Sequence, residues 1–244
     1  MAAAAREQGR TARKGAGGAA AARGTYAVGD ARRQKILDTA VDHFARWGFH
    51  ASSLARIADD CGITQGGLLH HFRGKEDLLL RVLAQSELHD VERLFTDPPG
   101  GRDGGAVPAD EGAVARYFAT VVALAADNAR RPGIVRMFQT LVGESGNPGH
   151  PAHAYFTERY ARVLGRTVAL LEAGVACGEL RADTDCEAAG RETLAVMDGL
   201  QIQWILAPAA VDMPVLLHAF LDRLLRGISA AGTGLAPYVP DARA

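Results

Sequence analysis

Apolar residues recur at helical spacing along most of the chain. In the first such segment Ile36, Ala40 and Phe44 lie four residues apart, which places them on one face of a helix. Gly48 stands where this helix would end. No stretch of useful length alternates between apolar and polar residues, and no segment repeats another. The pattern therefore predicts an all-α protein.

Glycine and proline mark the breaks between the later helices. The first helix is followed by two short predicted helices, over about 53–60 and 64–72, and by a longer one over about 75–95. A Gly/Pro-rich loop is expected over 96–110. The remaining helices are expected at about 111–130, 133–145, 152–177, 185–206 and 213–230.

The two ends of the chain differ in composition from the rest. Residues 1–29 consist mostly of Ala, Gly and Arg, and residues 232–244 are interrupted by Gly and Pro. Neither segment has enough large apolar side chains to offset the entropy lost on ordering. We therefore predict a disordered basic tail at the N-terminus and a loose tail at the C-terminus.

Charge is distributed unevenly. The whole chain has 27 Lys and Arg residues against 28 Asp and Glu residues, a net charge of −1. Residues 1–81 contain thirteen basic and eight acidic residues, a net charge of +5, so residues 82–244 carry −6. A basic N-terminal part suits contact with nucleic-acid phosphates. The basic tail fits either such an arm or a solvated segment that raises solubility.

Several classes of protein are disfavoured. The three cysteines, Cys61, Cys177 and Cys186, form no C-x-x-C pair, so we expect no disulfide framework. No apolar run is long enough for a membrane span, and the N-terminus lacks a signal-peptide core. We expect a cytoplasmic protein without membrane contact. The common catalytic and phosphate-binding motifs are missing, so we expect no enzyme and no cofactor.

Histidine pairs do not predict a metal site. His70 and His71 are adjacent, and neighbouring residues on a helix point about 100° apart. His150 and His153 lie in a Pro/Gly segment without a supporting cluster of thiols or carboxylates. No bound metal is expected.

The segment after Gly48 has the spacing of a helix-turn-helix. Two short helices cross closely only if the first carries a small residue and the turn permits a left-handed backbone. Ala58 is the small residue and Gly62 the turn residue, while Ser53 and Thr64 stand at N-cap positions. The same pattern also fits an ordinary helical hairpin.

Many residues between 32 and 83 match one family pattern in register. They are Ile36, Ala40, Phe44, Trp47-Gly48-Phe49, Ser52-Ser53, Ile57-Ala58, Gly62-Ile63-Thr64, His71-Phe72 and Lys75-Glu76. On these residues the segment resembles the DNA-binding domain of the TetR family of transcriptional regulators. Residues 197–213 (MDGLQIQWILAPAAVDM) resemble the end of the BetI-type effector domain.

The resemblance implies two domains. A three-helix helix-turn-helix DNA-binding domain is expected over 30–78, and a helical-bundle effector and dimerisation domain over 79–231. The chain would then act as a homodimeric, ligand-responsive repressor of transcription, reading a palindromic operator of double-stranded DNA through the helix at about 64–72. An architectural nucleic-acid binder without effector, or a helical enzyme or metabolite-binding protein, are the alternatives.

DNA contacts are expected around the second short helix. Gln65 is the best candidate for base readout, since its amide can pair with adenine. Gly66 and Gly67 either allow close approach of the backbone to DNA or merely weaken the helix. Leu69 stands where members of the family usually have an aromatic residue, typically tyrosine. Because leucine cannot donate a hydrogen bond to phosphate, we expect this phosphate contact from His70 instead. Phosphate contacts are expected from Ser52, Ser53, Thr64, His70 and Lys75.

The larger, acidic part should hold a pocket for a small-molecule effector and a subunit interface. Dimerisation is expected mainly through the helices at 185–206 and 213–230, whose apolar faces also fit an internal core. A quaternary-ammonium ligand would suit aromatic walls. The candidate pocket residues are Tyr117, Phe118, Met137, Phe138, Tyr155, Tyr160, Met197, Gln201 and Trp204.

Overall fold

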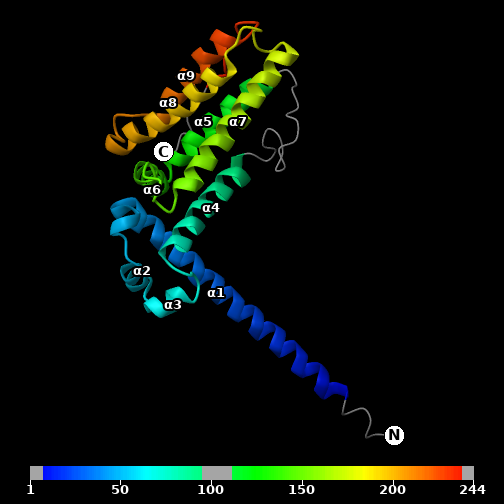
Figure 1. Ribbon diagram of the computed structural model, residues 1–244. Coiled ribbons are helices and arrows are strands. Elements are labelled where there is room, and N and C mark those ends of the chain that lie inside the picture. The colour runs from blue at the N-terminus through cyan, green and yellow to red at the C-terminus, as the bar shows by residue number, and fades with distance from the viewer. Residues whose placement is uncertain (1–7, 95–111, 238–244) are drawn as a thin grey trace.

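The computed structural model describes residues 8–94 and 112–237, with the backbone alone for 8–28 and 88–94. Figure 1 shows α1–α3 at one end of the molecule, α5–α9 at the other, and α4 running between them. The helices are α1 (Gln8–Ala51), α2 (Leu54–Cys61), α3 (Gln65–Leu69), α4 (Lys75–Leu94), α5 (Ala113–Ala129), α6 (Pro132–Glu144), α7 (His153–Cys177), α8 (Cys186–Leu206) and α9 (Met213–Ile228).

The all-α prediction is confirmed. Within the described ranges no strand forms, and a single bridge joins Leu180 to Ser229. The helices α5 to α9 begin and end within about two residues of the predicted bounds. The loop expected at 96–110 lies outside the described residues.

Three boundaries differ from prediction. The backbone of α1 is helical from Gln8, where composition predicts disorder, because alanine has the highest helix propensity of all residues. The second short helix ends at Leu69, three residues early, with His70 as its C-cap. The expected loose C-terminal tail is in part packed, since Leu235 is buried and its N–H donates to Asp222. Residues 1–7 and 238–244 lie outside the described residues.

Two clusters of buried side chains form the core. The first joins α1–α4 through residues such as Phe44, Ile57 and Leu68, and it includes Met137 and Leu141 of α6. The second joins α5, α7, α8 and α9. Helix α6 thus packs against α1 with one face and against α5 and α8 with others. It connects the two ends of the molecule together with α4, which contacts α5, and α7, whose Phe156 lies in the first cluster.

The end of α1 is bent at a glycine. Gly48 has φ 67° and ψ −171°, a conformation that residues with a Cβ rarely adopt. The bend turns Phe49 into the first core cluster, where it is buried. The glycine predicted to end the helix therefore redirects the chain toward α2.

No helix in the described part of the chain has the length and hydropathy that crossing a membrane requires.

Candidate functional site

Helices α2 and α3 form the predicted helix-turn-helix. Helix α2 ends at Gly62, whose φ of 70° and ψ of 34° are left-handed. The N–H of Ile63 then bonds back to the carbonyl of Ala58 at 3.0 Å. Ile57, Ala58 and Leu68 are buried where the helices meet. The small residue, the turn glycine and the hydrophobic contact occupy the positions that the spacing predicts.

Thr64 caps the start of α3. Its Oγ1 accepts the N–H of Gly67 at 3.1 Å, which satisfies one of the free donors of the first turn. Ser53 occupies the corresponding place before α2, but its side chain makes no capping hydrogen bond. Its hydroxyl therefore stays a candidate for contact with phosphate.

The outer face of α3 is open to solvent. Gln65, Gly66, Leu69 and His70 are exposed, and Gly67 is half-buried. Neither glycine has a positive φ. A Cβ added at either glycine would come no closer than 3.4 Å to another heavy atom, so the packing of the chain itself does not require glycine there. An external surface that approaches the backbone closely would give these two glycines a role.

Two expected phosphate contacts are used inside the protein. Ser52 is buried and its Oγ donates to the carbonyl of Gly48 at 2.6 Å. The ammonium of Lys75 donates to the carbonyls of Phe49, His50 and Ser52 at 2.9, 3.2 and 3.0 Å, and it lies 4.3 Å from the Phe49 ring centroid. Ser52 and Lys75 therefore stabilise the end of α1, and we withdraw them as DNA contacts.

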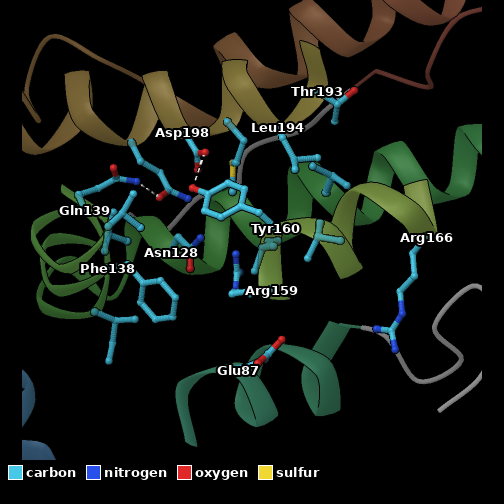
Figure 2. Close-up of a pocket in the computed structure, with 18 of the residues that line it drawn as sticks. Glu87, Asn128, Phe138, Gln139, Arg159, Tyr160, Arg166, Thr193, Leu194 and Asp198 are labelled. Carbon is cyan, nitrogen blue, oxygen red and sulfur yellow. Dashed lines mark hydrogen bonds between the residues drawn. The ribbon is translucent and has the colours of Figure 1, made fainter. Parts of the chain in front are cut away.

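A cavity of about 180 Å³ lies among helices α4 to α8 (Figure 2). Its apolar wall includes Val121, Leu124, Ile134, Val135 and Val142 from α5 and α6. Two hydrogen bonds between helices cross its polar side. Tyr160 donates to Asp198 at 2.7 Å, and Gln139 donates to Gln201 at 2.7 Å.

The cavity takes five of the nine predicted pocket residues, namely Tyr117, Phe138, Tyr160, Met197 and Gln201. The other four have different positions. Phe118 and Trp204 pack in the second core cluster, and Met137 in the first. The hydroxyl of Tyr155 bonds to Glu87 and to the carbonyl of Leu83. These four residues are corrections to the predicted pocket.

Charged residues in the lining were missed by sequence reasoning. Glu87, Arg159, Arg166 and Asp198 all line the cavity. Burial raises the pKa of the Asp198 carboxyl, while the hydrogen bond from Tyr160 and the charge of Arg159 partly lower it. Burial, with the bond to Asp198, raises the pKa of the Tyr160 phenol. The positions of aromatic residues in the sequence do not indicate these charged groups. The groups come from three different helices, which only the fold brings together.

No group of three or more side chains suited to a metal ion occurs among the described residues. His70 and His71 stack edge to face, with their centroids 5.7 Å apart. Nδ1 of His150 bonds to Ser145 and to the N–H of Ala152, and its Nε2 lies 3.4 Å from a Glu144 carboxylate oxygen.

Two family models match the chain, and together they cover about two thirds of it. Residues 36–82 match the model described as bacterial regulatory proteins of the tetR family. Residues 113–226 match the C-terminal domain of BetI-type transcriptional repressors. The two matches fall on the helix-turn-helix and on the helices around the cavity.

Individual proteins agree with these models. The HTH-type transcriptional repressor KstR2 of Rhodococcus jostii is 28% identical over 201 residues, which are 82% of this chain and 92% of that protein. The fold resembles the complex of triclosan with SmeT, an efflux-pump repressor of Stenotrophomonas maltophilia (TM-score 0.70, 18% identity, 86% and 98% of the chains). It also resembles Bacillus subtilis FadR in complex with stearoyl-CoA (TM-score 0.64, 21% identity, 80% and 98%).

With both models matched in register and the helix-turn-helix geometry in place, the chain belongs to the TetR family of bacterial regulatory proteins.

Proposed function

We propose that the chain is a homodimeric repressor that binds a palindromic operator and is released from it by a small molecule held in the cavity. One observation carries the proposal. Helix α6 lines the cavity with Phe138 and Gln139, and its last residue, Glu144, bonds to the backbone of Phe49 beside the helix-turn-helix. Helix α6 thus contacts both the cavity and the end of α1 that leads into the helix-turn-helix.

In this proposal the surface that contacts DNA is the exposed face of α3. Gln65 would read a base edge, while Gly66 and Gly67 allow the backbone to lie close to DNA. Ser53, Thr64 and His70 are the phosphate candidates that remain. Leu69 is 44% exposed and would offer an apolar contact, for instance to a thymine methyl group.

The subunit interface would be formed by the paired ends of α8 and α9. Ile202 and Leu206 on α8, and Val215 and Leu216 on α9, are large apolar side chains exposed to solvent. An exposed apolar patch of this kind marks an interaction site. The deeper leucines of α9, such as Leu217 and Leu221, are buried in the chain's own core. A two-fold axis through this patch would match a palindromic operator.

Relatives support a small-molecule effector. SmeT is known in complex with triclosan and FadR with stearoyl-CoA, and both share the fold. The dimer would exist in two states that differ in the distance between its two α3 helices. A ligand that fits only one orientation of α6 would shift the population toward one of these states. We further propose that the protein acts in the cytoplasm, where the chromosome lies, and that it has no catalytic activity and no cofactor.

A footprint on the DNA upstream of the gene, with Gln65→Ala beside the unaltered protein, tests the proposal. A protected palindrome is expected, and the variant should lose preference at one symmetric base position while keeping its binding to unrelated DNA. Salt-dependent protection without any sequence preference would favour an architectural DNA-binding protein instead.

A further inference from the structure

The cavity is mostly apolar but contains four charged residues. Glu87, Arg159, Arg166 and Asp198 line it together with the aliphatic side chains of α5 and α6. In such a site the charges without a protein partner determine which ligand fits.

The two acidic groups are already bound. Asp198 accepts a hydrogen bond from Tyr160 at 2.7 Å. Glu87 forms an ion pair with Arg162 and accepts a hydrogen bond from Tyr155 at 3.2 Å. Glu87 is thus neutralised by Arg162, whereas Asp198 has a hydrogen bond from a neutral phenol and only a through-space attraction to Arg159, which partly offsets the rise that burial causes in its pKa.

Arg159 differs from them. Among the residues that the structure describes, it has no ion pair and no hydrogen bond, and its buried Nε is without an acceptor. Its guanidinium lies 5.3 Å from the centroid of the Phe138 ring, which also lines the cavity. Figure 2 shows Arg159 in the interior of the site, with Tyr160 above it and Glu87 below it in the view. A buried donor of this kind calls for an acceptor.

Arg166 does not fill the same role. It also lines the cavity, but in Figure 2 its side chain is directed away from Tyr160 and Asp198. It adds positive charge to the site, but its side chain does not point toward the polar side of the cavity.

We propose that the effector is an amphipathic anion whose carboxylate or phosphate is bound by Arg159 and whose apolar part lies against Val121, Leu124 and Ile134. This rests on the proposed function, because it names the ligand class of the same cavity. A guanidinium holds such a group with two parallel N–H bonds, and it binds most strongly where water is excluded.

The same geometry disfavours the quaternary ammonium that the BetI-type resemblance suggests. One face of Phe138 already lies against the Arg159 cation, which leaves less aromatic surface for a ligand cation. A ligand ammonium would also be repelled by Arg159, which forms no ion pair among the described residues and whose Nε has no acceptor. The acidic groups that would attract it have their own partners in Tyr160 and Arg162.

Three probes with nearly equal alkyl chains of nine or ten carbons test the proposal. Calorimetric titration of the full-length protein with decanoate, decanol and decyltrimethylammonium, each below its micellar concentration, compares an anion, a neutral molecule and a cation. Decanoate should bind at least about tenfold more tightly than decanol, and the cation should bind most weakly. Decanoyl-coenzyme A, added as a fourth probe, distinguishes a free carboxylate from an acyl thioester that supplies phosphates.

Substitutions of Arg159 test whether its positive charge is the one that binds the anion. Arg159→Gln should weaken the binding of decanoate at least about tenfold and leave the binding of decanol unchanged. Arg159→Lys should keep part of the preference for the anion. Arg136→Gln, on the exposed surface of α6, is the matched control and should change neither. Thermal unfolding and operator affinity without ligand report whether each variant is folded.

The outcomes separate this proposal from the proposed function. Tighter binding of the cation, equal binding of all probes, binding of none, or an Arg159→Gln variant that retains the anion preference would each overturn it. The repressor function would still stand if the protein protects a specific operator, which is measured independently of the probes.

Discussion

The carboxylate of Glu144 accepts the backbone N–H of Phe49 at 2.7 Å, and so joins the last turn of α6 to the bend at the end of α1. The same carboxylate lies 3.4 Å from Nε2 of His150, whose ring stacks edge to face on Phe49 and His50. From the other side Lys75 of α4 holds the carbonyls of the bend. Helices α4 and α6 therefore both bond to the end of α1, directly before the helix-turn-helix.

Replacing Glu144 should weaken this junction. Glu144→Ala leaves the buried N–H of Phe49 without an acceptor, which should lower the free energy of unfolding by about 1–3 kcal/mol. Denaturant unfolding measures this loss, and operator titrations with and without effector measure the coupling, which should also fall. Glu158→Ala, an exposed glutamate of α7, is the control. Unaltered coupling in Glu144→Ala would show that the effector signal travels by another route.

Gly48 and Gly62 should respond differently to the same substitution. Both have positive φ, so alanine is strained at each position by about 1–2 kcal/mol. At Gly48 the new Cβ would also collide with the Glu144 carboxylate, whereas nothing lies within 4 Å of it at Gly62. Gly48→Ala should therefore lower the unfolding midpoint more than Gly62→Ala. Adding Glu144→Ala should relieve part of the Gly48→Ala cost, and a strictly additive double variant would argue against the collision.

The residues that sequence reasoning placed well are those whose roles are local. Gly62, Ala58 and Thr64 have hydrogen-bond partners within five residues, so spacing alone predicts the turn and the cap. Ser52 could not be separated from Ser53 in this way, because its burial depends on the bend at Gly48. Lys75 bonds to carbonyls 23 to 26 residues away, a contact that only the folded chain forms.

The residues of the cavity also divide into those that the sequence predicts and those that only the fold reveals. Aromatic residues on helix faces were reasonable candidates, but four of the nine pack elsewhere, because the rotation of each helix decides which side faces the space. Arg159 and Asp198 gave no signal in the sequence. Asp198 has its partner Tyr160 on another helix, and the Nε of Arg159 has no acceptor among the described residues. Both facts depend on the folded chain.

Removing the cap of α3 should weaken both stability and operator binding. Thr64→Ala deletes the acceptor for the N–H of Gly67 and should cost about 1 kcal/mol. The helix has only five residues and contains two glycines, so it has little else to hold its first turn. Thr64→Ser keeps the hydroxyl and should restore most of both properties. Chemical denaturation and operator titration check the pair, and equal behaviour of the two variants would contradict a capping role.

Stability should fall in mild acid because of His150. Burial lowers the pKa of His150 below its usual 6.5, and the nearby Glu144 offsets only part of that effect. The unfolded chain therefore binds more protons than the folded one as pH falls through about 6.5 and below, so the free energy of unfolding decreases there. His71, whose pKa is also lowered mainly by burial, adds in the same direction.

Urea unfolding at pH 7.5, 6.5 and 5.5 measures this slope. His150→Asn keeps an acceptor near the N–H of Ala152 but does not titrate, so its stability should depend less on pH than that of the unaltered protein. His218→Asn, at a more exposed histidine, serves as the control. An identical slope in all three proteins would exclude His150 as the source.

A charge placed in the apolar patch on α8 and α9 should separate the proposed dimer. Leu206 is 79% exposed and Val215 39% exposed, so neither is needed for the core of its own chain. Leu206→Glu and Val215→Glu should each leave the unfolding midpoint of the subunit nearly unchanged, yet shift sedimentation toward the monomer, because a two-fold axis brings each new carboxylate into the interface twice. Leu80→Glu, at an exposed leucine of α4 that is 40% accessible, is the matched control and should stay dimeric. The monomeric variants should bind a single half-site weakly and lose the full operator, since two linked readers bind more tightly than one. Dimers that persist in both variants would place the interface on another surface.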